Sequence, residues 1–186
     1  MSHALSLARN GVGMTSPNPP VGAVLVSNGQ AIGEGFHRKA GMPHAEREAF
    51  ADALKRGNAS LLPQSTLYVT LEPCSTSGRT PACTDAILEY GVKRVVYGTQ
   101  DPNPKHAGAA DKLLAIHGIV VEHGVMEEEC RRLIRPFTKT IKKQTKAHAT
   151  NANLIINIFF LRRFTSGEIS LSMPMFIFFN FLSFHI

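Results

Sequence analysis

One histidine, one glutamate and two cysteines have the types and order of a catalytic zinc site. His44 and Glu46 flank Ala45, and Cys74 and Cys83 follow further along the chain. One imidazole and two thiolates can bind Zn²⁺ and leave a tetrahedral position open for water, which is typical of catalytic zinc. A glutamate beside such a site can carry protons, as in hydrolytic removal of an amino group from a heterocyclic base. We predict one Zn²⁺ per chain on His44, Cys74 and Cys83, with Glu46 as the catalytic residue.

Local patterns predict where these residues lie. An apolar face runs through residues 45–56 and ends at Gly57, so His44 and Glu46 flank the first turn of a helix. Residues 66–71 are β-rich and predict a buried strand that leads to Cys74. The imidazole and the first thiol are therefore expected at the ends of adjacent elements.

A second helix is predicted to carry Cys83. Thr80 is its expected N-cap, Pro81 occupies the first helical position, and Gly91 follows its end at Tyr90. A helix N-terminus favours negative charge and lowers the pKa of a thiol, so we expect Cys83 to ionise readily.

The remaining elements predict an α/β fold. Strands alternating with helices favour a three-layer α/β/α domain around a mixed five-stranded sheet. The dipeptide Asn28-Gly29 indicates a hairpin between the first two strands. The further predicted helices cover residues 2–11, 111–117 and 126–141, and the further strands cover 21–26, 31–35, 93–98 and 119–122.

Charge is distributed unevenly along the 186 residues. The net charge is +6, but residues 1–130 hold 11 Lys and Arg against 13 Asp and Glu, whereas residues 131–186 hold 9 against 1. A basic run is usually a solvated helix face, so nucleic acid is not the expected partner. Three cysteines do not make a disulfide framework, and no secretory signal is visible at the N-terminus. We expect a cytoplasmic protein in which Cys130 is a spare thiol.

The composition changes near residue 146. We predict a deaminase domain over residues 1–145 and an apolar tail over 146–186. The apolar runs of the tail are shorter than the roughly 20 residues that a membrane span needs. No membrane span is therefore expected.

Five segments together resemble the deaminase domain of the riboflavin-biosynthesis deaminase-reductases. They are Ser16–Val24, His44-Ala45-Glu46, Leu71–Ser75, Gly78–Thr84 and Asp101–Pro104, and the resemblance runs to about residue 137. Eight residues separate the two cysteines, and a loop of this length with Gly-Arg-Thr-Pro is specific to that family among zinc deaminases. The resemblance implies a cytidine deaminase-like fold.

The resemblance also implies a substrate, a phosphorylated pyrimidine. The implied reaction converts 2,5-diamino-6-ribosylamino-4(3H)-pyrimidinone 5′-phosphate to the corresponding 5-aminouracil phosphate. Asn18 would bind the ring, and Asp101 and Asn103 would line the ribose-phosphate side. Arg79, in the loop between two zinc ligands, offers a cation for the phosphate.

Two departures from the family pattern affect what is expected. Thr76 stands where family members often carry histidine, which concerns the local substrate contacts. The family commonly continues into a reductase domain that uses NADPH, whereas residues 146–186 show no Gly-rich cofactor motif. We expect no NADPH site and no reductase step in this chain. The fold commonly assembles, so a homo-oligomer is possible, although the sequence does not give the oligomeric state.

Two alternatives remain open at the level of sequence. The first is a zinc deaminase of another base or nucleotide, such as cytidine, dCMP, guanine or adenosine in tRNA; those groups typically close the site with Cys-x-x-Cys. The second is a non-catalytic zinc fragment whose basic tail binds nucleic acid, with salt-sensitive affinity.

Overall fold

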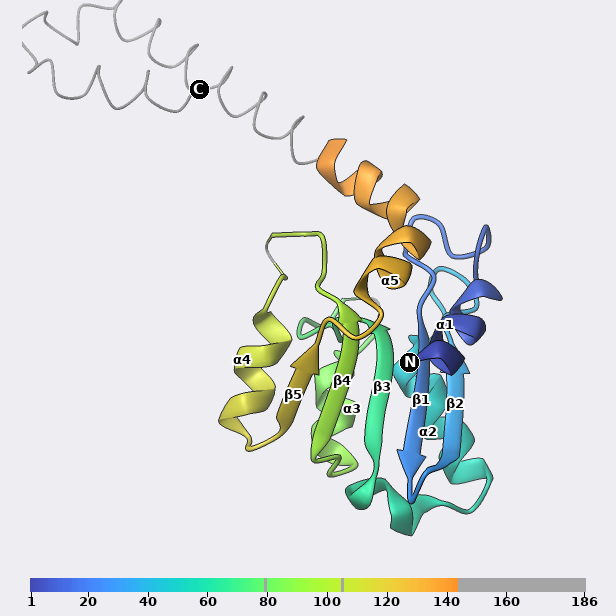
Figure 1. Cartoon of the computed structure of the whole chain (residues 1–186), viewed down its shortest axis with the longest axis vertical. Coiled ribbons are helices and arrows are strands. Elements are labelled where there is room, and N and C mark those ends of the chain that lie inside the picture. Colours follow the sequence, from blue (N-terminus) through green and yellow to red (C-terminus); the bar gives the residue numbers. More distant parts are fainter. Residues whose placement is uncertain (79, 105, 144–186) are drawn as a thin grey trace, which may run out of the picture. The chain divides into compact units, whose positions relative to one another are not determined.

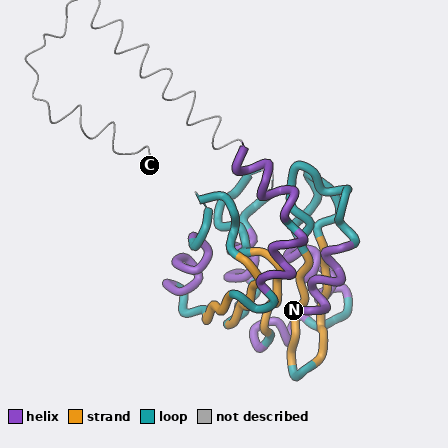
Figure 2. The backbone as a smooth tube through the Cα atoms, turned by 45° about the horizontal axis from the view of Figure 1, so that its top comes forward, coloured by secondary structure: helices purple, strands orange, loops and turns teal. Residues whose placement is uncertain are grey.

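The computed structural model describes residues 1–143, apart from residues 79 and 105. By its internal contacts the chain divides into two units, Met1–Lys142 and Lys143–Ile186. The first unit is the α/β domain in Figure 1, and Figure 2 gives the same backbone from a tilted direction. The predicted tail, residues 146–186, lies outside the described residues.

A mixed five-stranded sheet forms the centre of the first unit, as the sequence predicts. The strand order is β2-β1-β3-β4-β5, and the strands are β1 (Gly22–Ser27), β2 (Gln30–Phe36), β3 (Thr66–Leu71), β4 (Arg94–Thr99) and β5 (Val120–His123). β1 runs antiparallel to both β2 and β3, whereas β3, β4 and β5 are parallel. The carboxyl ends of β3 and β4 therefore lie side by side (Figure 1).

The antiparallel edge begins with the predicted hairpin. Ser27 pairs with Gln30 across a two-residue loop of Asn28 and Gly29. Both loop residues have positive φ, at 51° and 74°, which the mirror-image turn between two antiparallel strands requires. The Asn-Gly signal in the sequence thus has a direct backbone cause.

Helices cover both faces of the sheet, which gives three layers. The helices are α1 (Ser2–Arg9), α2 (Ala45–Lys55), α3 (Cys83–Glu89), α4 (Ala109–Ile116) and α5 (Glu127–Leu133). α1 and α5 pack on one face, while α2, α3 and α4 pack on the other (Figure 1). Strand glycines permit close approach: a Cβ on Gly22 would overlap the Ala4 carbonyl of α1, and one on Gly35 would overlap the Ala45 carbonyl of α2.

The third cysteine belongs to the packing between α5 and the sheet. Cys130 is fully buried, and a Cβ on Gly98 of β4 would overlap its sulfur. Burial raises the pKa of the Cys130 thiol to about 11, so this thiol stays protonated at neutral pH. The expectation that Cys130 stands apart from the metal ligands is met.

The structure differs from the local predictions in one missed element and two helix boundaries. A 3₁₀-helix, η1 (Ala59–Gln64), precedes β3; its six residues are too short to show a helical period and include Pro63. The last predicted helix is interrupted at Ile134, so that α5 ends at Leu133 and residues 135–143 continue as helix. The start of α3 also differs from expectation, as described below.

No helix in the described part of the chain is long and apolar enough to cross a membrane.

Candidate metal centre and active site

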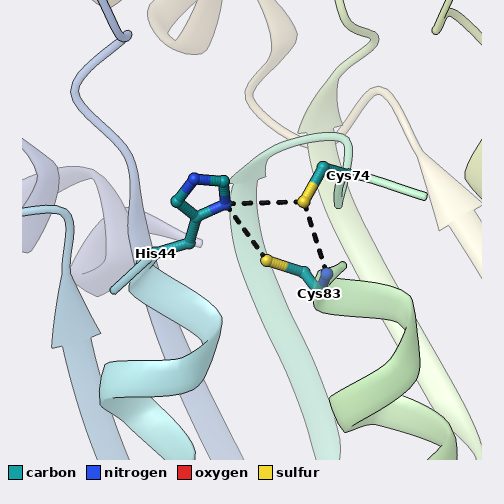
Figure 3. Close-up of side chains that lie close together, drawn as sticks. All are labelled: His44, Cys74 and Cys83. Atoms are coloured by element: carbon teal, nitrogen blue, oxygen red, sulfur yellow. Dashed lines mark hydrogen bonds between the residues drawn. The ribbon is translucent and has the colours of Figure 1, made fainter. Parts of the chain in front are cut away.

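The three predicted ligands meet at one end of the sheet. His44 is the N-cap of α2, Cys83 is the first residue of α3, and Cys74 lies three residues beyond the end of β3. In Figure 3 a single ring nitrogen of His44 faces both sulfur atoms. Residues from three separate elements, 39 positions apart at the extremes, are thus brought together as predicted.

The distances suit a tetrahedral zinc ion. Nδ1 of His44 lies 3.4 Å from the sulfur of Cys74 and 3.3 Å from that of Cys83. Zinc with ordinary bonds to nitrogen and sulfur would place these atoms about 3.6 Å apart. All three ligand atoms lie within 4.8 Å of one another. The donor set and its spacing therefore fit Zn²⁺ with one position left for water.

The two thiols ionise in the opposite order from that expected. A hydrogen bond from the Cys83 thiol, above all, lowers the pKa of Cys74 to about 4, and His44 contributes further. The same coupling, followed by burial, holds the pKa of Cys83 well above its usual range. In the metal-free protein the pKa of Cys83 is thus raised by Cys74 and by burial, where the helix N-terminus alone predicts a lowered pKa. Zinc binding requires the Cys83 thiol proton to leave.

Glu46 lies in the first turn of α2 beside the metal site. Its side chain is 3% exposed, and burial raises the pKa of its carboxyl group to about 7, with the Cys74 thiolate adding to the effect. A carboxyl group with a pKa near neutrality can both take and give a proton at physiological pH.

The start of α3 differs from the prediction. Thr80 is not its N-cap; the helix begins at Cys83 with Ala82 at the N-cap, and among the described residues no side chain caps it. The N–H groups of Cys83 and Thr84 instead donate to the carbonyl oxygen of Cys74, at 3.0 and 3.2 Å. Because Cys74 satisfies these donors itself, the helix needs no capping side chain.

Arg47 ties α2 to the segment that enters α3. Its Nη2 donates to the carbonyl oxygen of Ala82 at 2.8 Å, and its Nε donates to that of Pro81 at 3.3 Å. Ala82, which precedes Cys83, is thereby held against α2, whose N-cap is His44. Sequence reasoning missed Arg47, because an arginine in a predicted helix is ordinarily assigned to the solvent-exposed face.

A pocket of about 160 Å³ opens beside the metal site. Its lining includes His44, Glu46 and Cys74, together with two of the four predicted substrate residues, Asn18 and Asp101. Asn103 is not among the lining residues, but its N–H donates to the Asp101 carboxylate at 2.8 Å. Arg79 is outside the described residues.

Three further lining residues were missed by sequence reasoning: His37, Glu72 and Phe137. His37 is 2% exposed and forms a hydrogen bond with Asn18. Phe137 comes from the helical segment 135–143, far from the metal ligands in sequence. Glu72 entered the sequence analysis only within the Leu71–Ser75 segment, although a glutamate between a buried strand and a predicted ligand indicates a carboxylate that needs hydrogen-bond partners.

Comparisons with known proteins agree with this geometry. The sequence model of the cytidine and deoxycytidylate deaminase zinc-binding region matches residues 1–99, which include the three ligands. The riboflavin biosynthesis protein RibD of Aquifex aeolicus is 49% identical over 144 residues, which are 77% of this chain and 39% of that protein. The chain thus spans about two fifths of the length of that relative.

Solved structures give the same picture. A Thermotoga maritima protein described as a diaminohydroxyphosphoribosylaminopyrimidine deaminase and 5-amino-6-(5-phosphoribosylamino)uracil reductase is 49% identical, with a TM-score of 0.72, over 77% of this chain and 40% of that one. A structure from work on tRNA:A34 deaminases is 29% identical, with a TM-score of 0.56, over 72% of this chain and 99% of that one. From the match over residues 1–99 and the identity to RibD proteins, the chain belongs to the cytidine and deoxycytidylate deaminase family, within which it is a homologue of RibD.

Proposed function

We propose that this chain catalyses zinc-dependent hydrolytic deamination of 2,5-diamino-6-ribosylamino-4(3H)-pyrimidinone 5′-phosphate to 5-amino-6-(5-phosphoribosylamino)uracil. The observation that carries the proposal is one pocket lined by metal ligands, Glu46, Asn18 and Asp101. The description of the Thermotoga relative supports this substrate, and the name of the Aquifex relative supports a place in riboflavin biosynthesis. The proposal concerns the deamination step alone.

Glu46 has the central role in the proposed reaction. A zinc ion on His44, Cys74 and Cys83 would supply a Lewis acid that acidifies a bound water molecule. The Glu46 carboxylate would take one proton from the attacking water and pass it to the ring nitrogen. It would then take the second proton of the same oxygen and pass it to the amino group, which leaves as ammonia while the carbonyl forms. The raised pKa of Glu46, about 7, suits a group that must both accept and donate.

Asn18 would present an acceptor to the ring. Nδ1 of His37 lies 3.0 Å from the carbonyl oxygen of Pro43, which can only accept, so Nδ1 carries the proton. Burial lowers the pKa of His37, so the ring is neutral and its Nε2 accepts from the Asn18 amide nitrogen at 3.1 Å. The amide oxygen of Asn18 is then left to accept from the N–H or amino group of the substrate.

The pocket is large enough for only part of the substrate. Its volume of about 160 Å³ lies below the ~300–1,000 Å³ typical of whole-ligand pockets, so the pyrimidine ring fits while the ribosyl phosphate remains at the mouth. Asp101 lines the pocket and supports Asn103 by a hydrogen bond. We propose that these residues contact the ribose and that Arg79 binds the phosphate.

A substrate panel tests the proposed function. Zinc-loaded protein is incubated separately with the diaminopyrimidine phosphate, cytidine, dCMP, guanine and tRNA, and released ammonia is measured. The proposal predicts ammonia from the diaminopyrimidine phosphate, together with a product of the mass of the 5-aminouracil phosphate. Turnover of another base without turnover of this compound would refute it.

The second candidate function is deamination of adenosine in tRNA. The observation in its favour is the 29% identity to the structure from tRNA:A34 deaminase work, almost all of which is covered. Against it stands the eight-residue gap between Cys74 and Cys83. The tRNA sample of the panel distinguishes the two.

We further propose one zinc per chain, a cytoplasmic location that keeps the thiols reduced, and assembly into a homo-oligomer. Metal analysis of the purified protein measures the zinc content per chain, and light scattering measures the oligomeric state.

A further inference from the structure

The side chain of Glu72 connects the strand that leads to Cys74 with the loop that follows β4. It is 5% exposed. Its Oε2 accepts hydrogen bonds from the N–H groups of Asp101, at 3.2 Å, and Gly108, at 3.1 Å. Its Oε1 accepts from the N–H of Ala110 at 3.2 Å. The side chain therefore holds both ends of the loop between β4 and α4.

The backbone of Glu72 also contacts the end of β4. Its N–H donates to the carbonyl oxygen of Thr99, the last residue of β4, at 2.9 Å. Main chain and side chain together thus fix the relation between the exit of β3 and the exit of β4. Cys74 leaves from the first exit and Asp101 from the second.

The chemistry of the site requires a carboxylate. A buried charge is costly unless hydrogen bonds compensate it, and here three backbone donors point at one group that only accepts. A glutamine would direct its amide N–H₂ at one or two of those donors, leaving buried N–H groups unpaired. Because the Glu72 oxygens are occupied in this way, the proton carrier of the pocket is Glu46.

The loop between β4 and α4 contains Asp101, a proposed substrate contact. Asp101 lines the pocket beside Glu72 itself, and its carboxylate in turn accepts from the N–H of Asn103. A shift of the Asp101 backbone would displace this turn relative to the metal ligands. Misplacement by about 1 Å can cost a large factor in catalysis even when no reacting group is altered.

We infer that Glu72 is a positioning residue, whose buried carboxylate holds the loop between β4 and α4 so that Asp101 meets the sugar-phosphate part of the substrate at the metal-site pocket. The contact with substrate rests on the proposed function, whereas the hold on the loop does not. A variant of Glu72 should therefore impair substrate binding before it impairs the metal site.

The test compares Glu72→Gln with wild type and with Glu122→Gln, which removes an exposed carboxylate of β5 that pairs with Arg94 of β4. Zinc content, KM and kcat for the diaminopyrimidine phosphate, and amide hydrogen exchange are measured on the zinc-loaded full chain. Glu72→Gln should keep its zinc, raise KM about tenfold with a smaller change in kcat, and speed exchange at Asp101, Gly108 and Ala110. Glu122→Gln should resemble wild type in all three.

A double variant distinguishes positioning from general destabilisation. If Glu72 acts through Asp101, then Asp101→Ala with Glu72→Gln should raise KM little more than Asp101→Ala alone. Should Glu72→Gln not fold, Glu72→Asp, which keeps the charge but withdraws it by one methylene, serves in the same comparisons.

Loss of zinc, faster exchange throughout β3 and β4, or additive effects on KM would overturn the inference. An unchanged KM with unchanged loop exchange would do the same. If wild type does not turn over the diaminopyrimidine phosphate, the proposed function fails, and the exchange measurement alone then decides whether Glu72 holds the loop.

Discussion

The backbone N–H of Cys83 donates to the carbonyl oxygen of Cys74 at 3.0 Å and lies 3.3 Å from its sulfur. The main chains of the two predicted thiol ligands are therefore joined directly. The eight residues between them form a loop whose two ends are fixed. Such a loop can carry substrate contacts without altering the distance between the ligands.

Arg47 supports the same junction and predicts an effect on metal affinity. Arg47→Ala removes the hydrogen bonds to the carbonyl groups of Pro81 and Ala82, so that Cys83 is less well held. Because outer partners of metal ligands commonly contribute 10–100-fold, we expect zinc affinity to fall by about tenfold or more. Competition with a chromophoric chelator measures the zinc affinity of the variant and of wild type. Arg94→Ala, which removes an exposed ion pair between β4 and β5, is the matched control and should bind zinc as wild type does.

Glu46 should be required for turnover and dispensable for metal binding. Glu46→Gln preserves the size of the side chain but removes its ability to take a proton. We expect full zinc content and a fall in kcat of about 10²–10⁴-fold, the usual contribution of general acid–base catalysis. Metal analysis and ammonia release on the same sample give both numbers. Near-normal turnover in this variant would remove Glu46 from the mechanism.

Arg79 should act on the phosphate alone. Arg79→Ala is expected to raise KM for the phosphorylated substrate by tenfold or more, about the loss of one charge-assisted hydrogen bond. KM for the dephosphorylated nucleoside should change little. Steady-state kinetics on the two compounds make the comparison. An equal rise in KM for the two compounds would show that Arg79 does not bind the phosphate.

Gly98 should be essential to the packing of α5. A Cβ there would overlap the sulfur of Cys130 and lie 2.9 Å from the carbonyl oxygen of Thr70. Gly98→Ala should therefore lower the free energy of unfolding by about 1–3 kcal/mol, as overpacking of a core does. Gly78→Ala, where a Cβ has open space, is the control. Urea denaturation of both variants tests the difference.

Sequence patterns located much of this fold because the relevant signals are local. Asn28-Gly29 specifies its turn through positive φ, and the apolar face of residues 45–56 ends at Gly57. The cluster of His44, Cys74 and Cys83 could be anticipated because few chemistries use these residue types in this order. All five strands follow from β-rich runs, the first two joined by the hairpin turn and the others separated by helical patterns.

Other features depend on contacts between distant segments. Thr80 has the sequence signature of an N-cap, but Cys74 satisfies the first turn of α3 from another element. The order in which the thiols ionise follows from their mutual hydrogen bond, which no linear pattern encodes. Glu72 and Phe137 reach the pocket only through tertiary packing.

Titration of the metal-free protein with zinc tests the central claim most directly, namely that His44, Cys74 and Cys83 hold the ion on which deamination depends. Ammonia release from the diaminopyrimidine phosphate is measured at each addition. The rate should be near zero without zinc, rise linearly, and level off at one zinc per chain, whereas Cys83→Ser should need far more zinc. A rate that does not respond to zinc, or that levels off equally in Cys83→Ser, would contradict the account.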